Sequence, residues 1–268
     1  MLIVRCAMPA LVAAVLAVAP AAAQELAPHR AAYSVTTLDH GKPSGEPPGT
    51  YAYELKLTCD SYMMIQRLRL EVAGERGATA SEQQSQMTES RDGRRLRFEH
   101  LTTAGGRQAS LVKGEATLGD DGKGEARFSE PEGQTVALPA GTMFPAAIAL
   151  ETIRQAKAGA AGFDALFFFG DKVKPPQSVN VVIGRMPKRL SDVKIPEGGE
   201  SLAEGRGRIY YRAGFFDSQA KGQGEPTFEM SSVTLDNGIE LYGTHEEGET
   251  GIEYRITRLE PLPKPECH

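Results

Sequence analysis

Cysteine is the residue type with the clearest chemical role in this sequence. The 268 residues include three cysteines, and Cys6 lies in an N-terminal leader that we expect to be removed, which leaves Cys59 and Cys267. An even number of cysteines in an exported protein favours a disulfide bond. Two free thiols or a redox pair are the alternative, but the sequence has no C-x-x-C motif. We therefore predict a structural disulfide that fastens the C-terminus to an early strand.

Histidines and carboxylates are the next candidates, as metal ligands or as general acids and bases. The histidines beyond the leader are His29, His40, His100, His245 and His268. No two of them are two or four residues apart, the spacing that aims two imidazoles at one ion from a strand or a helix. The densest group of candidate ligands is His245, Glu246, Glu247 and Glu249. We interpret this group as a solvated hairpin tip and expect no metal site.

Signatures of the common enzyme classes are absent from the sequence. There is no G-x-S-x-G, H-E-x-x-H or G-x-x-x-x-G-K-[ST] motif. Asp120, Asp121 and Glu125 lack the spacing and the final bidentate Glu of a calcium loop, and they indicate a polar turn. Because the chain has no Trp, paired carboxylates would also lack an obvious sugar platform. We predict a protein that is not an enzyme and carries no cofactor.

Charge argues against nucleic acid as a partner, because the formal net charge is −5 and phosphates require a basic stripe. The one basic cluster is Arg91, Arg94, Arg95 and Arg97. Acidic and apolar residues interrupt it, which favours the wet face of a strand and the turn before it. Met63 and Met64 beside Tyr62 are interpreted as core, with the lining of an adaptable apolar groove as the alternative.

The first residues have the three parts of a secretory signal peptide. Arg5 supplies the positive region, residues 10–19 form a short apolar run, and small residues end at Ala23 before Gln24. The run is too short for a membrane-spanning helix. We expect cleavage between Ala23 and Gln24, a periplasmic location, and no transmembrane segment in the mature chain.

Most of the remaining chain alternates between apolar and polar residues. Runs at 51–57, 68–72, 96–98 and 252–256 have a strict period of two, which is typical of half-buried antiparallel strands. Turn residues separate the runs, and Asn237-Gly238 favours a type I′ hairpin turn. Residues 163–169 (FDALFFF) are expected to form a core strand. The pattern predicts a mainly β protein, a large antiparallel sheet of about a dozen or more strands in one domain, residues 24–268.

One segment, residues 144–158, has a helical period instead. Ala146, Ala149, Leu150 and Ile153 share a face, Pro145 suits a first turn, and Gly159 suits a stop. We predict one amphipathic helix that plugs or buttresses the sheet. Segments 40–49, 172–177 and 187–200 have the composition of loops, and the proline-rich tail 261–268 cannot be a central strand.

Several segments in order resemble the EipB-like family of periplasmic envelope-integrity proteins of Gram-negative bacteria. They are the HRAAY strand at 29–33, the strand 51–59 ending in Cys59, Gln66-Arg67, LPAGTMFP at 138–145, VIG at 182–184, DNGI at 236–239, and LEPLP at 259–263 before Cys267. The chain departs from the family pattern at Asp60-Ser61-Tyr62, where Gly-Trp is usual, and at Ala146-Ala147-Ile148, where Thr-Gln-His is usual.

The resemblance implies a spiral or open β-barrel of about fourteen strands, the disulfide Cys59–Cys267, and a role in envelope integrity. It implies no catalytic residues. We expect a monomer that contacts another envelope component, either a protein or a lipid. The alternative is a periplasmic carrier that holds a lipid or a lipidated partner in an apolar groove of the open barrel.

Overall fold

A computed structural model describes residues 25–45, 48–72, 79–218 and 224–267 of the chain. The expected signal peptide, with its cleavage between Ala23 and Gln24, lies outside these residues and remains a prediction.

Within the described residues the chain forms sixteen strands in one sheet. The strands of the first half are β1 (His29–Asp39), β2 (Lys42–Pro43), β3 (Gly49–Leu57), β4 (Ser61–Val72), β5 (Thr79–Ser90), β6 (Arg95–Ala104), β7 (Arg107–Leu118), β8 (Gly124–Glu130) and β9 (Thr135–Leu138). The second half contributes β10 (Thr142–Met143), β11 (Gly162–Phe167), β12 (Gln177–Gly184), β13 (Arg208–Phe216), β14 (Phe228–Leu235), β15 (Glu240–Glu247) and β16 (Thr250–Pro261). The helical elements are α1 (Pro145–Lys157), α2 (Glu200–Ala203) and one 3₁₀ turn (Lys188–Leu190).

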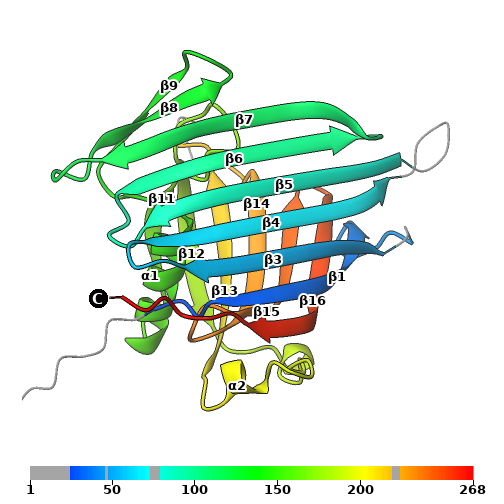
Figure 1. Cartoon of the computed structure of the whole chain (residues 1–268). Coiled ribbons are helices and arrows are strands. Elements are labelled where there is room, and N and C mark those ends of the chain that lie inside the picture. The colour runs from blue at the N-terminus through cyan, green and yellow to red at the C-terminus, as the bar shows by residue number, and fades with distance from the viewer. Residues whose placement is uncertain (1–24, 46–47, 73–78, 219–223, 268) are drawn as a thin grey trace, which may run out of the picture.

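The sheet is a curled strip whose two ends meet at a seam. Its order runs β10-β11-β12-β13-β14-β15-β16-β1-β3-β4-β5-β6-β7-β8-β9, with β2 beside β1. All pairs are antiparallel except the short β10–β11 pair. Figure 1 shows β3 to β7 crossing in front of the steeply running strands β12 to β15. The predicted fold class, a large β-sheet in an open barrel with an amphipathic helix, is confirmed.

The alternation in the sequence places one face of each strand inside the barrel. On β3, for example, Leu55 and Leu57 are buried while Ala52 and Lys56 are exposed. Register shifts that mark β-bulges occur at four points along the sheet. Bulges bend and twist strands, so they help the strip to curl.

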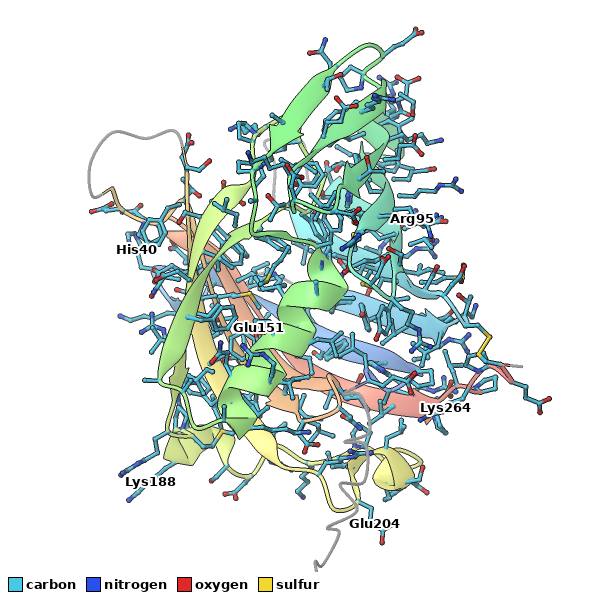
Figure 2. The ribbon with its side chains drawn as sticks, turned by 90° about the vertical axis from the view of Figure 1, so that its left-hand side faces the viewer. His40, Arg95, Glu151, Lys188, Glu204 and Lys264 are labelled. Carbon is cyan, nitrogen blue, oxygen red and sulfur yellow. A yellow bond between two sulfur atoms is a disulfide. The ribbon has the colours of Figure 1, made fainter. Side chains whose placement is uncertain are left out.

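Helix α1 closes one side of the barrel, as the pattern at 144–158 predicted. Ala146 and Ile153 are buried in the core, and Ala149, Leu150 and Ala156 pack against it. Figure 2 shows α1 between the two layers of the strip. Its first turn is held by the buried carboxylate of Glu89 on β5, which accepts hydrogen bonds from the backbone N–H groups of Ala146 (2.6 Å) and Ala147 (2.9 Å).

Three local expectations are corrected by the structure. Residues 163–169 do form a strand, but β11 lies beside the seam and is only partly buried, with Phe168 just beyond it buried. The 236–239 hairpin exists, but the Leu235 N–H bonds to the Ile239 carbonyl oxygen (2.7 Å) around a loop of residues 236–238, and in that loop only Gly238 has a positive φ (87°). The turn is therefore not type I′. The Asn237 side chain donates to the Leu202 carbonyl oxygen (2.8 Å). The segment 187–200 is also not all loop, since it contains the 3₁₀ turn and the start of α2.

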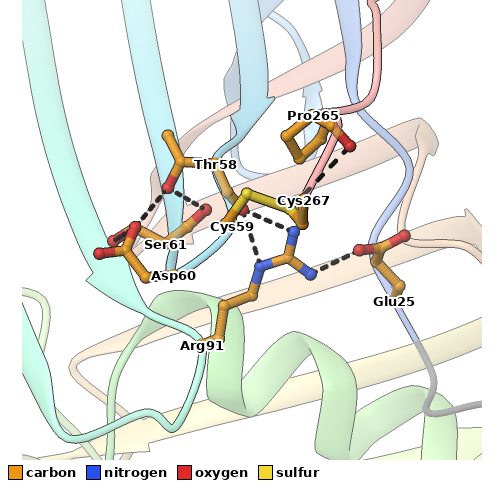
Figure 3. Close-up of a disulfide and its surroundings, with 8 residues drawn as sticks. All are labelled: Glu25, Thr58, Cys59, Asp60, Ser61, Arg91, Pro265 and Cys267. Atoms are coloured by element: carbon orange, nitrogen blue, oxygen red, sulfur yellow. Dashed lines mark hydrogen bonds and ion pairs between the residues drawn. A yellow bond between two sulfur atoms is a disulfide. The ribbon is translucent and has the colours of Figure 1, made fainter.

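The first and last described segments of the chain lie together at the middle of the strip. β1 pairs with β16 along its whole length, and the N–H of Leu262 donates to the carbonyl oxygen of Pro28 (3.1 Å). A disulfide joins Cys59 to Cys267, with the Cα atoms 5.6 Å apart (Figure 3). It ties the C-terminal tail to the end of β3, as predicted.

Candidate functional site

Five tyrosines gather inside the barrel because they occupy inward positions on four strands, of which β16, β1 and β3 are adjacent and β13 lies farther along the sheet. Tyr51 and Tyr53 share the inner face of β3 with the buried Leu55 and Leu57. The other three are Tyr33 on β1, Tyr211 on β13 and Tyr254 on β16. Burial raises the pKa of each of these hydroxyls above its ordinary value. All five therefore stay protonated at neutral pH.

Three of the rings form a compact triangle. The centroids of Tyr33 and Tyr51 are 5.1 Å apart, and Tyr254 lies 5.6 Å from Tyr33 and 5.5 Å from Tyr51, in edge-to-face contacts. Gly243 on β15 faces Tyr254 across the ladder, and a Cβ there would overlap the ring and hydroxyl of Tyr254. The glycine therefore allows the Tyr254 ring to lean across β15.

Glu240 places a carboxyl group beside these rings. A bulge between β14 and β15 pairs Val233 with Tyr242 and Thr234 with Glu240, which leaves Leu241 as the extra residue. The Glu240 carboxyl accepts a hydrogen bond from Ser232 Oγ (2.5 Å), and the Tyr33 hydroxyl donates to the backbone carbonyl oxygen of Glu240 (2.9 Å). Desolvation by burial outweighs the bond from Ser232 and raises the pKa of Glu240 to about 7.

His245 is the second titratable group of this cluster, and its position corrects the sequence interpretation. Its Nε2 is hydrogen-bonded to the Tyr254 hydroxyl (3.0 Å), and its ring contacts the rings of Phe228 and Tyr254. Burial lowers the pKa of His245 to about 4, so the ring is neutral at pH 7. The hairpin tip consists of exposed residues 247–250 instead.

Water reaches parts of this interior. Although they point inward, Tyr51, Tyr53, Tyr211, Glu240 and His245 all keep intermediate exposure. Among the described residues, the hydroxyls of Tyr51 and Tyr53 have no hydrogen-bond partner, and neither is a fully buried orphan atom.

The polar groups of the interior cluster are hydrogen-bonded to one another, with His245 bonded to a tyrosine hydroxyl and Ser232 bonded to Glu240. A Ser–His pair occurs elsewhere in the described residues, where His100 Nδ1 lies 2.8 Å from Ser85 Oγ and His100 Nε2 lies 3.1 Å from the Phe169 carbonyl oxygen. Across the described ranges, no group of three His, Cys, Asp or Glu side chains is close enough to share a metal ion. Polar side chains inside an aromatic wall can still fix the position of a bound molecule.

A cleft of about 230 Å³ lies on the outside, between α1 and the β5–β6 turn. Tyr62 and Glu89 form part of its lining, with Arg91 and Gly93 from the turn and Ala147 from α1. Burial raises the pKa of Glu89 to about 7, against the lowering effect of its two backbone hydrogen bonds.

Arg91 does not lie on a wet face with the rest of its cluster. Its guanidinium stacks on the Tyr62 ring (4.9 Å), donates to the Thr58 carbonyl oxygen, and pairs with Glu25 (2.5 Å) beside the disulfide (Figure 3). Arg94, Arg95 and Arg97 are exposed, as predicted. Asp60 and Ser61 form a polar turn, in which Thr58 and Ser61 donate to the Asp60 carboxylate.

The other candidate residues from the sequence lie in turns, in the core or on the surface. Asp120 and Asp121 lie in the β7–β8 turn, where Asp120 pairs with Arg94. Met64 and Tyr62 are buried in the core, whereas Met63 faces outward and is 37% exposed. His29 and His100 are buried, and burial lowers the pKa of both rings.

The tyrosine and Glu240 cluster was missed by the sequence reasoning. Glu240 lies between the apolar residues Ile239 and Leu241, so a regular strand would turn its side chain outward. The bulge at this point turns it inward instead. In the sequence, Tyr51 and Tyr53 alternate in step with the apolar residues of their strand, and this predicts that both face inward. The alternation does not predict that Glu240 lies beside them.

These features define a class, that of a curled, barrel-like β-sheet protein with an aromatic interior and a helix across one side. No helix of the described residues combines the length and apolarity needed to cross a membrane. The chain matches the EipB-like family over residues 20–263, and it belongs to that family.

A curated protein and a solved structure, both from Brucella abortus, are similar to this chain. The cell envelope integrity protein EipB of strain 2308 is 27% identical over 250 residues, which cover 91% of this chain and 87% of EipB. A crystal structure of a β-barrel-like protein of the domain of unknown function DUF1849 superposes with a TM-score of 0.76 at 24% identity. That alignment covers 90% of this chain and all of the other, and it supports the fold.

Proposed function

We propose that this protein is a non-enzymatic component of the periplasm that supports the integrity of the cell envelope by contacting another envelope component. Membership of the EipB-like family along residues 20–263 carries this proposal, together with the name of its Brucella relative. The N-terminal leader supports export to the periplasm.

A gene deletion tests the proposed role. Cells without the gene should become more sensitive to detergents, cell-wall antibiotics and osmotic stress. The full gene should restore resistance, whereas a gene without codons for residues 2–23 should not, because its product stays in the cytoplasm. Unchanged sensitivity in a strain without a second family member would overturn the proposal.

A second candidate is a carrier for an amphiphile inside the barrel, and it is favoured by the interior. The partly exposed walls at Tyr51, Tyr53 and Tyr211 are next to partly buried apolar side chains, so polar and apolar surfaces adjoin. Native mass spectrometry of gently purified protein should then find a bound amphiphile. Protein that never retains one, and binds none that is added, would exclude the carrier role.

A further inference from the structure

Glu240 is an acidic group without a cationic partner. The groups that act on its carboxyl, besides burial, are the hydroxyls of Ser232 and Tyr254. None of the lysines, arginines or histidines that the structure describes forms an ion pair with it, although exposed carboxylates such as Glu115 and Glu260 do pair. A buried carboxylate that lacks a counter-charge is costly, so a bound cation would be strongly favoured there.

The walls around Glu240 also suit a cation. The faces of aromatic rings are electron-rich and attract ammonium groups, and quaternary ammonium groups in particular. Tyr51, Tyr53 and Tyr211 line the interior with partly exposed rings, and the Glu240 charge acts on all three hydroxyls. An anionic ligand would meet the Glu240 carboxylate instead, with no described lysine or arginine among the groups that act on it.

Apolar side chains continue the same interior away from the carboxyl. Leu68, Leu70 and Ile252 are only partly buried and pack against the core cluster that contains Tyr33 and Tyr254. Met230 and Phe228 are also partly buried, and they pack against the cluster that contains Val179 and Phe215. A molecule with a charged head and an apolar tail would therefore satisfy both parts of this surface.

We propose that the interior binds an amphiphile with an ammonium head group, which lies beside Glu240 and against the rings of Tyr51, Tyr53 and Tyr211. This inference rests on the carrier role proposed above and specifies the charge of its ligand. The cation takes the place of the missing counter-charge, while the tail lies along the apolar wall.

Binding of such a cation depends on pH. The groups that face Glu240 are Tyr33 on β1, Tyr51 and Tyr53 on β3, Tyr211 on β13, Ser232 on β14, His245 on β15 and Tyr254 on β16. Of these only Glu240 titrates near neutrality, because the tyrosines stay protonated and His245 stays neutral. Since the cation needs the carboxylate form, its affinity should fall about tenfold between pH 8 and pH 6.

Three amphiphiles with the same twelve-carbon tail separate the head-group chemistry. The exported chain, with its disulfide intact, is titrated by calorimetry at pH 8 with dodecyltrimethylammonium, dodecyl maltoside and dodecyl sulfate, each below its micelle concentration. We expect the ammonium compound to bind at least tenfold more tightly than the maltoside. Glu240→Gln should remove that advantage and leave maltoside binding unchanged. Glu115→Gln, an equal charge change on the outer surface, should leave all three affinities unchanged.

The outcomes separate this inference from the carrier role. Equal binding of the ammonium compound and the maltoside, or tighter binding of the sulfate, would overturn the cation site and leave the carrier role standing. No binding of any of the three would overturn both. If Glu240→Gln does not fold, the wild-type protein decides: a tenfold loss of ammonium binding from pH 8 to pH 6, with constant maltoside binding, supports the site, and no loss overturns it.

Discussion

Replacing Glu240 by Gln should change how the stability of the protein depends on pH. The folded state raises the pKa of this carboxyl from 4.5 to about 7, so it holds the proton more tightly than the unfolded chain does. The corresponding stability is fully present below pH 4.5 and is lost as the pH rises through 7. The difference between the two pKa values corresponds to about 3 kcal/mol.

The wild-type curve alone does not isolate this effect, because His245 acts in the opposite direction. Its pKa falls from 6.5 to about 4 on folding, so it contributes stability above pH 6.5 that is lost as the pH drops toward 4. Subtracting the wild-type curve from that of Glu240→Gln cancels the His245 contribution. The variant should therefore gain about 2.5 kcal/mol relative to wild type between pH 5 and pH 8, because part of the full change falls below pH 5.

Urea unfolding followed by circular dichroism, with the disulfide intact, measures this difference at each pH. Tyr53→Phe is the matched control, because it alters the same wall without removing a group that titrates between pH 5 and pH 8. Its difference from wild type should be constant over that range. A Glu240→Gln difference that is also constant would refute the raised pKa and the burial that causes it.

Three further substitutions test other features. Glu89→Ala leaves two N–H groups at the start of α1 without their acceptor and should lower the free energy of unfolding by about 2 kcal/mol, with Glu89→Gln losing less; equal, negligible losses would contradict the cap. Replacing Cys59 and Cys267 by serine should lower the thermal midpoint, since closing so long a loop is worth at most about 5 kcal/mol; an unchanged midpoint would remove the disulfide as a source of stability. Gly243→Ala should cost about 1–3 kcal/mol and shift the Tyr254 ring resonances in NMR spectra; an unperturbed ring would contradict the close approach.

The fold was largely predictable because the alternation of apolar and polar residues can be recognised within each short segment of the sequence. Strict alternation at 51–57 and at 252–256 reflects a sheet with one face in water, and the helical period at 144–158 stands out against it. The disulfide followed from cysteine number and export. In the 236–239 turn, by contrast, the loop spans residues 236–238 and is longer than the two-residue loop that Asn-Gly favours, so only Gly238 has a positive φ.

The interior site was not predictable, because it depends on register. Glu240 turns inward only through the bulge opposite Val233 and Thr234, and a one-residue shift reverses a side chain's face. His245 looked like part of an acidic tip since its neighbours in sequence are glutamates. Its partner Tyr254 comes from the next strand.

The strand order places the first and last strands of the chain, β1 and β16, side by side in the middle of the sheet. The two ends of the strip, β9 and β10, are joined by residues 139–141 alone, while the first and last described segments meet at the opposite place, where Lys264 pairs with Glu25 (3.2 Å). A circular permutant of residues 25–267, cut at 139–141 and closed by a short linker between Glu25 and Cys267, would keep every strand ladder. It would remove the covalent link between the two edges of the seam, so the barrel of such a permutant is held curled by contacts between its two halves, among them the hydrogen bonds from α1 to Glu89.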